Sequence, residues 1–216
     1  MVYAQNEQEE ITMIISHKYK FVFIHIPKTG GSWVKKVLLK IDPDALDVEH
    51  DVFPQDERYG HYKFYEIQDW EIYDEIKSYL FFAVMRHPLK RLVSYYNYIN
   101  GYPGHHKHSQ IVGKTFEQSQ PTLAPISPLM TWLKNKDGAV QKDIKILTLK
   151  NISKQLQQML CDRGVPVSLT KQIKKESHKK VNVSKTYIEY KDLDISQFDL
   201  SLLHIEDLVY YLMQDD

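Results

Sequence analysis

The sequence predicts an α/β protein in which helices cover both faces of a central parallel sheet, giving three layers. Three continuous apolar runs are typical of buried strands, at residues 21–26, 80–85 and 144–149. Each run is followed by a segment in which apolar residues recur at helical spacing. Buried strands that alternate with amphipathic helices along a chain indicate a parallel sheet covered on both faces.

The predicted helices start after Gly31, at Pro88, near Ile152 and within residues 198–212. The first of them ends before Pro43, because proline does not continue a helix. Pro88 is well placed to begin the second helix, since proline is favoured at the first helical position. A shorter helix is expected in the 70s, ahead of the second strand.

Length and composition indicate an ordinary globular protein. The chain has 216 residues, 43% of them apolar and 26% charged, which is enough for one domain with a proper core. Its 28 basic residues balance its 28 acidic ones, so the net charge does not suggest nucleic-acid binding or attachment to a membrane surface. We expect a single domain over residues 1–216, with a long irregular loop at about 100–128, where Gly, Pro, His, Ser and Gln dominate. Loops of this length often act as lids or binding segments.

The compartment is predicted from the cysteine count and the first residues. Cys161 is the single cysteine, which rules out an internal disulfide and fits a reducing environment. The start MVYAQNEQEE has neither the basic nor the apolar region of a signal peptide. The longest apolar runs are too short to cross a bilayer. We therefore expect a cytoplasmic protein without a membrane span.

The first candidate site lies where the first strand turns into a helix, at residues 24–33. Gly30 and Gly31 allow a tight turn, and the helix that follows presents unpaired N–H groups and a positive dipole end. Lys28 adds a charge, and Thr29 and Ser32 add hydroxyl groups. A glycine turn alone is most often only a turn. The lysine and hydroxyl residues around this one favour an anion site.

The second candidate site follows the second strand. Arg86 stands at the end of that strand, where a guanidinium can hold a phosphate through paired hydrogen bonds. Ser94 lies about 200° around the next helix from Leu92, away from the apolar stripe. The alternative is that Arg86 pairs with a surface carboxylate and Ser94 is merely exposed. Lys28 precedes the glycines and Arg86 replaces a metal-holding aspartate, which disfavours a magnesium-dependent kinase or NTPase.

Together the two segments resemble the carbohydrate sulfotransferase superfamily, in particular the branch that includes heparan sulfate 2-O-sulfotransferases. IHIPKTGGS is similar to that family's 5′-phosphosulfate loop, and RHPLKRLVSYY is similar to its 3′-phosphate motif, R-x-P-x-x-R-x-x-S-x-Y. The resemblance implies a sulfotransferase fold like that of the P-loop NTPases. It also implies transfer of a sulfuryl group from 3′-phosphoadenosine 5′-phosphosulfate to a hydroxyl acceptor without a metal. A glycan is the acceptor that the family resemblance favours.

Carried over by position, the resemblance assigns roles to individual residues. The 5′-phosphosulfate would be held by Lys28, Thr29, Gly30, Gly31 and Ser32, and the 3′-phosphate by Arg86 and Ser94. Trp33 stands where the family usually has a small hydroxyl residue. Either its backbone N–H still binds the co-substrate or its ring packs in the core.

Sulfuryl transfer also needs charge stabilisation and a base. Lys28 is the candidate that stabilises the leaving oxygen, and a histidine suits the role of base near neutral pH. His61 resembles the family's catalytic histidine by its place between the two motifs, with His50 and Glu49 as rivals. The alternative for His61 is an exposed loop histidine. We expect the histidines at positions 105, 106 and 108 to line an acceptor-facing loop rather than to bind a metal.

Residues 171–185 contain six lysines and one glutamate. This segment is either a solvated basic face or a contact for an anion. Its later part, with Asn182 and Ser184, weakly resembles a family loop that closes over the nucleotide. Two other functions remain open from the sequence, a small-molecule kinase on a related fold and a non-catalytic nucleotide-binding relative. The identity of the acceptor and the oligomeric state are not predicted.

Overall fold

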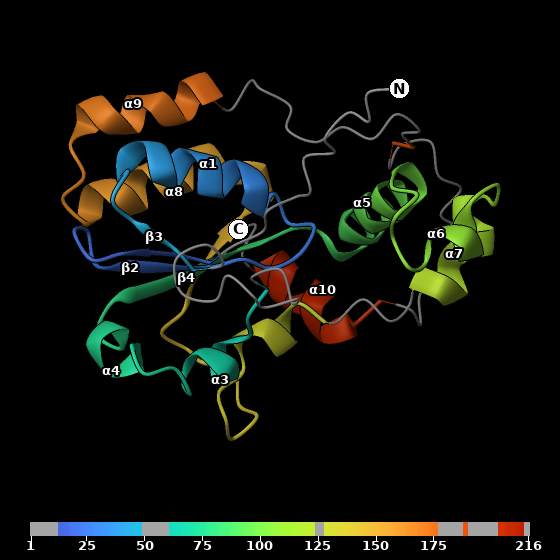
Figure 1. Ribbon diagram of the computed structural model, residues 1–216, viewed down its shortest axis with the longest axis horizontal. Helices are drawn as coiled ribbons and strands as arrows, with labels where there is room; N and C mark the ends of the chain where they lie inside the picture. Colours follow the sequence, from blue (N-terminus) through green and yellow to red (C-terminus); the bar gives the residue numbers. More distant parts are fainter. Residues whose placement is uncertain (1–12, 49–60, 124–127, 177–187, 190–202, 214–216) are drawn as a thin grey trace.

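The computed structural model describes residues 13–48, 61–123, 128–176, 188–189 and 203–213. At its centre lies a five-stranded sheet with the strand order β3-β1-β2-β4-β5 (Figure 1). The strands are β1 (Ile14–Ser16), β2 (Phe21–Ile24), β3 (Leu46–Asp47), β4 (Leu80–Met85) and β5 (Lys145–Thr148). Strands β2, β4 and β5 are parallel neighbours, which confirms the α/β class and the three predicted strands.

The sheet is mixed rather than wholly parallel. Strand β1 pairs antiparallel with both β2 and β3, and these two short strands were not predicted. They contain three and two residues, too few for a periodic pattern to be visible in the sequence. The antiparallel edge is therefore an addition to the predicted parallel core.

Nine α-helices and two 3₁₀ helices are found in the described ranges. The helices are α1 (Gly31–Ile41), α3 (Phe64–Ile67), α4 (Tyr73–Ile76), α5 (Pro88–Gly101), α6 (His108–Ile111), α7 (Phe116–Leu123), η1 (Met130–Leu133), η2 (Leu149–Asn151), α8 (Ile152–Asp162), α9 (Val167–Glu176) and α10 (Ile205–Met213). The predicted helix starts after Gly31, at Pro88 and near Ile152 are confirmed. The last helix is also present, although residues 198–202 of its predicted range lie outside the described residues.

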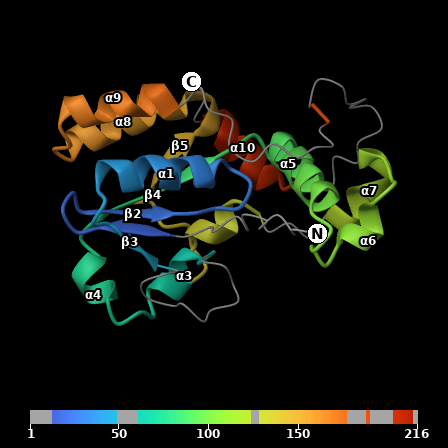
Figure 2. The ribbon, with the colours of Figure 1, turned by 45° about the horizontal axis from the view of Figure 1, so that its top comes forward.

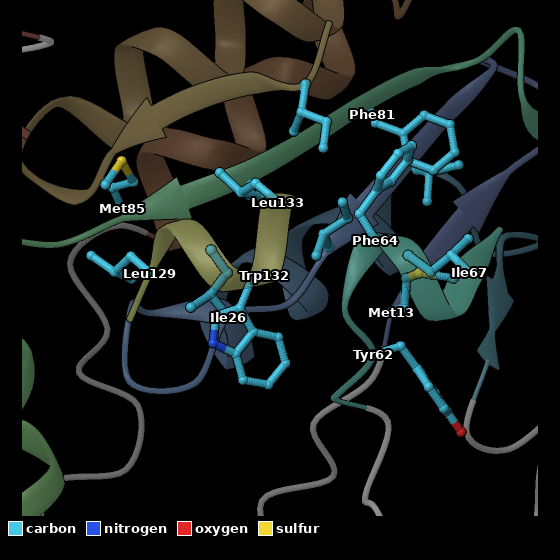
Figure 3. Packing of buried hydrophobic residues seen from close by; sticks show 14 of the residues in the cluster. Met13, Ile26, Tyr62, Phe64, Ile67, Phe81, Met85, Leu129, Trp132 and Leu133 are labelled. Carbon is cyan, nitrogen blue, oxygen red and sulfur yellow. The ribbon is translucent and has the colours of Figure 1, made fainter. Parts of the chain in front are cut away.

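Helices cover both faces of the sheet. Helices α1, α8 and α9 pack on the face that carries Phe21, Phe23 and Phe82, and α3, α4 and η1 lie on the opposite face (Figures 1 and 2). Figure 3 shows that opposite face, where Phe81 and Met85 of β4 meet α3 and η1. Because side chains of a strand alternate between faces, a strand that is apolar throughout is buried on both sides.

A separate apolar cluster joins α5, α6 and α7, which lie beyond the end of the sheet (Figures 1 and 2). It corrects the prediction of a long irregular loop at 100–128, because α6 and α7 fall within that segment. Ile111, Phe116 and Leu123 are the buried anchors, and the Tyr96 hydroxyl donates to the Lys114 carbonyl at 2.7 Å. Three anchors are too sparse to produce a helical period, so the contact with α5 is what organises these helices.

The C-terminal helix α10 is tied to η1 on the second face of the sheet. The buried carboxylate of Asp207 accepts hydrogen bonds from the backbone N–H groups of Leu129 and Met130, at 2.6 and 3.0 Å. Among the described residues, no helix is long and apolar enough to cross a bilayer.

Candidate active site

The loop between β2 and α1 reverses the chain through two left-handed residues. Lys28 has φ 65° and Gly30 has φ 92°. A Cβ on Gly30 would approach Leu149 Cδ1 to 2.7 Å, so this glycine is needed for its conformation and for its close contact. The Thr29 hydroxyl is buried and donates to the Ile26 carbonyl at 2.8 Å, which fixes the turn from inside.

Gly31, the first residue of α1, lies against the buried imidazole of His25. A Cβ on Gly31 would fall 1.8 Å from His25 Nε2, a distance that no arrangement with both groups in place permits. Burial, assisted by the nearby charges of His61, Lys28 and Lys35, holds the pKa of His25 well below its usual range. The ring is therefore neutral at physiological pH and packs behind the loop.

The N-terminus of α1, where the same loop ends, has the features of an anion-binding site. Its N-cap is Gly30, which makes no side-chain capping bond, and the first turn contains no acidic residue. The first N–H groups of a helix have no partner within it and carry a partial positive charge. Trp33 follows in this turn, and its half-buried ring packs against the apolar cluster on the α1 face. Ring packing is thus observed, and binding of the co-substrate by the Trp33 backbone N–H stays a prediction.

The two segments predicted to bind phosphate meet at the backbone of this loop. Parallel pairing of β2 with β4, in which Ile24 lies opposite Ala83, places the ends of both strands side by side. Arg86 Nη1 donates to the carbonyl of Lys28 at 3.4 Å, across 58 residues of sequence. Ser94 lies half-buried on α5, which follows Arg86 directly. Lys28, the start of α1 and Arg86 therefore share one site.

Arg91 is a further residue of this arrangement, to which the sequence analysis gave no role. Its guanidinium is only 3% exposed, and its Nε donates to the carbonyl of Pro27 at 2.9 Å. Burial lowers the pKa of Arg91 to about 10, opposed by the charge of Asp207, so the group stays cationic near neutral pH. The signal in the sequence is the second arginine of the motif R-x-P-x-x-R-x-x-S-x-Y, which Arg91 occupies.

The side chain of Lys28 extends over α5. Its Nζ lies 3.8 Å from the centroid of the Tyr98 ring, which is a close cation–π contact. The ring of His105 is next to that of Tyr98, with 5.6 Å between centroids. Burial, together with the charges of His106, Lys107, Lys28 and His108, lowers the pKa of His105 to about 4. The ammonium of Lys28 therefore lies beside a neutral imidazole.

His61 lies next to His25, the residue that follows β2. Its Nδ1 is 3.2 Å from the backbone carbonyl of His25, and its ring is 5.1 Å from the His25 ring and 5.9 Å from the Trp132 ring. A carbonyl only accepts hydrogen bonds, so Nδ1 carries the proton in the neutral ring and Nε2 is left as an acceptor. This is the tautomer that a general base requires. The rivals His50 and Glu49 lie outside the described residues.

The histidines that follow α5, His105 and His108, make hydrogen bonds to the backbone of their own segment or of α5. His105 Nδ1 accepts from the backbone N–H of Lys107 at 3.1 Å, so its neutral ring carries the proton on Nε2. The Nδ1 of His108 is 2.8 Å from the carbonyl of Ile99, to which it donates. In the part of the chain that the structure describes, no three His, Cys, Asp or Glu side chains form a potential metal site.

The basic segment 171–185 is described only in its first part. Lys171 lies exposed on α9, whereas Asn182 and Ser184 lie outside the described residues. The two alternatives for this segment therefore stay predictions.

Comparison with known proteins gives a family match over most of the chain. A model of the sulfotransferase family matches residues 12–158, a range that includes the loop, Arg86, His61 and Tyr98 and ends before α9. Carbohydrate sulfotransferase 10 from Pongo abelii is 29% identical over 85 residues, which are 38% of this chain and 24% of the relative. Carbohydrate sulfotransferase 10 from Danio rerio is 31% identical over 85 residues, 38% of this chain and 23% of the relative.

The aligned part of the chain thus spans about a quarter of the length of these curated relatives. No solved structure matches the chain.

Proposed function

The chain belongs to the sulfotransferase family, and from this membership we propose that it transfers a sulfuryl group from 3′-phosphoadenosine 5′-phosphosulfate to a hydroxyl group, with a carbohydrate as the acceptor. The observation that carries the proposal is the contact between Arg86 and the Lys28 carbonyl. It brings two cationic groups to the edge of the sheet where α1 begins. A nucleotide with phosphate on both its 5′ and 3′ positions needs two such groups.

In this proposal the two ends of the co-substrate bind to different elements. The backbone N–H groups of residues 29–33 and the Lys28 ammonium receive the 5′-phosphosulfate. Ser32 is half-buried at the same turn and adds a hydroxyl, whereas the Thr29 hydroxyl already donates within the loop. Thr29 therefore contributes through its N–H. Arg86 and Ser94 receive the 3′-phosphate.

The reaction is an in-line displacement at sulfur. His61 Nε2 removes the proton of the acceptor hydroxyl as its oxygen forms a bond to sulfur. The bond between sulfur and the 5′-phosphate oxygen breaks, and Lys28 stabilises the charge that develops on that oxygen. The products are a sulfate ester and adenosine 3′,5′-bisphosphate, and the proton remains on His61 until solvent removes it. The tautomer set by the His25 carbonyl supports this role of His61.

A carbohydrate acceptor is favoured because both curated relatives are named carbohydrate sulfotransferases. The turn between α5 and α6 carries His105 and His106, with their rings stacked 4.4 Å apart, and His105 is within reach of the Lys28 charge. We propose that the acceptor enters on this side. Specificity would then depend on this turn.

Binding of the reaction product tests the proposed co-substrate. Calorimetry with adenosine 3′,5′-bisphosphate and with 5′-AMP should show a clear preference of the wild type for the bisphosphate. Arg86→Met should abolish that preference, because it removes the charge that faces the 3′-phosphate. Equal affinity of the wild type for both nucleotides would refute the proposal.

Turnover tests the proposed chemistry. With labelled sulfuryl donor and a panel of sugars, lipids and phenols, we expect sulfated product from the sugars, in equal amounts with and without a metal chelator. His61→Ala should lower kcat by about 10²–10⁴-fold while bisphosphate affinity is retained. Magnesium-dependent transfer of phosphate from ATP would instead identify a kinase. Bisphosphate binding without turnover in the wild type would identify a non-catalytic relative.

A further inference from the structure

The loop that carries Lys28 is held by helix α5 and by Arg86, which lies two residues before that helix. Arg86 donates to the Lys28 carbonyl and Arg91 to the Pro27 carbonyl. These two hydrogen bonds fix successive peptide groups at the point where Lys28 adopts its left-handed conformation. A left-handed lysine is uncommon and persists only where its surroundings enforce it. The backbone of Lys28 is thereby oriented by the second phosphate motif.

The side chain of Lys28 is held by the same helix. Its ammonium lies 3.8 Å from the Tyr98 ring centroid. Tyr98 is four residues after Ser94, so both side chains are on one face of α5. We propose that Tyr98 is a positioning residue for Lys28. The Tyr98 ring keeps the Lys28 ammonium on the face of α5 that receives the nucleotide. This inference rests on the proposed function, because it assigns Lys28 to the 5′-phosphosulfate.

The chemistry of an aromatic face suits this task. A carboxylate beside Lys28 would neutralise the ammonium and compete with the anionic co-substrate for it. The face of a ring attracts a cation through its quadrupole and leaves its charge intact. Lysine has a flexible four-carbon stem with three rotatable N–H donors. An aromatic contact therefore restricts the stem without itself occupying an N–H donor of the ammonium.

The Tyr98 ring is itself fixed by its neighbours. The His105 ring meets it edge-on, at 84° between planes, and the Tyr102 ring lies tilted at 34°, with centroids 5.8 Å away. The lowered pKa of His105 keeps that imidazole neutral near pH 7. Its proximity thus adds no positive charge that would repel the Lys28 ammonium. These two ring contacts restrict the orientation of the Tyr98 ring.

Two substitutions of Tyr98 separate the ring from its hydroxyl. Tyr98→Phe keeps the aromatic face, and we expect its kcat to stay within about twofold of the wild type. Tyr98→Leu removes the face, and we expect kcat to fall by roughly tenfold. Affinity for adenosine 3′,5′-bisphosphate should stay within about threefold in both variants, because Arg86 and the helix N-terminus are unchanged. The inference would be overturned if kcat fell equally in Tyr98→Phe and Tyr98→Leu, or if it did not fall in Tyr98→Leu.

A second readout does not depend on activity. Competitive acetylation of lysine amines, followed by peptide mass spectrometry, reports the accessibility of Lys28. We expect Lys28 to be modified faster in Tyr98→Leu than in the wild type or Tyr98→Phe. Tyr95→Leu is the matched control, since the Tyr95 ring faces Lys107 instead, at 5.5 Å. It should leave the rate at Lys28 unchanged. Equal rates at Lys28 in the wild type and Tyr98→Leu would refute the contact.

The two levels of the proposal fail in different ways. If the wild type shows no preference for the bisphosphate, the proposed function is wrong whatever the acetylation rates are. If the wild type binds the bisphosphate and turns over, but Tyr98→Leu matches it in kcat and in acetylation rate, the proposed function stands and the role of Tyr98 is wrong.

Discussion

Single residues in the β2–α1 loop are constrained by what lies behind it. Gly31 is a helix residue whose requirement for glycine comes from the His25 ring and not from its backbone angles. Gly30 combines both requirements, a left-handed conformation and a close contact with Leu149. The sequence shows two adjacent glycines. The reason for the second becomes visible only when His25, six residues earlier, is seen to be buried against it.

Gly31→Ala should destabilise the protein, because the new Cβ would lie 1.8 Å from His25 Nε2. We expect a loss of about 1–3 kcal/mol, as for overpacking in other cores, in the free energy of unfolding measured with urea. The double variant His25→Ala/Gly31→Ala removes the ring that clashes. Its two substitutions should cost less together than the sum of their separate effects. Additive losses would contradict the contact.

The neutral His25 also makes stability depend on pH. Its folded-state pKa is well below the ordinary histidine value of 6.5, so below pH 6.5 the unfolded chain binds a proton that the folded chain does not. Stability should therefore be unaffected above pH 6.5 and fall as the pH decreases, by up to about 1.4 kcal/mol per pH unit from this group. The fall ends once the pH is below the folded-state pKa.

Urea denaturation at several pH values checks this prediction. His25→Leu has no group to titrate, so its free energy of unfolding should decline less steeply below pH 6.5 than that of the wild type. His105, whose pKa is lowered to about 4, is present in both proteins and contributes equally to both slopes. Identical slopes in the two proteins would be evidence against a neutral, buried His25.

Among the elements, those with a clear apolar pattern were predictable, whereas the ten-residue helix α9 and several short elements were not predicted. Strand β4 and helices α1, α5 and α8 each carry enough apolar residues to show a period, and their predicted positions are confirmed. Strands β1 and β3 are too short, and α6 and α7 depend on α5 for their burial. Local pattern reports which residues avoid water, and it does so reliably only over several turns or alternations.

Helix α5 is tied to the β2–α1 loop through Arg91. Arg91→Met should lower the free energy of unfolding by about 1.5–3 kcal/mol, because the carbonyl of Pro27 loses a charged hydrogen-bond donor. Bisphosphate affinity should fall as well, since the loop is no longer held. Urea denaturation and calorimetry measure the two effects.

The control for Arg91 is its neighbour on the exposed side of the same helix. Lys90 is exposed, and Lys90→Met should change the free energy of unfolding by no more than about 0.5 kcal/mol. Similar losses in the two variants would show that the helix surface, and not the bond to the loop, is responsible.

At the scale of the whole molecule, α10 closes the second face of the sheet although it lies beyond the range matched by the sulfotransferase family model. Its Asp207 caps η1, which carries Trp132, and Trp132 contacts His61. The last helix in the sequence thereby supports the histidine proposed as the base.

Asp207→Asn should destabilise the protein by about 1.5–3 kcal/mol, because an amide can accept only one of the two backbone N–H bonds through its oxygen while its NH₂ group faces the other donor. Thermal and urea unfolding measure the loss. Glu206→Gln, on the exposed side of α10, should be nearly neutral. A stable Asp207→Asn protein would show that the cap is dispensable.

The amino-acid sequence alone was enough to predict the α/β class, the order of the main strands and helices, and two loop segments whose residue types favour anion binding. These follow from local patterns, because burial and turn formation depend on residues close together in the chain. The folded structure was needed to show that Arg86 and Arg91 hold the Lys28 loop, that Tyr98 contacts the Lys28 ammonium and that the His25 carbonyl orients His61. Three of these four contacts join residues 36 to 64 positions apart. The contacts of Arg86, Arg91 and Tyr98 exist because parallel pairing of β2 and β4 brings the ends of both strands together.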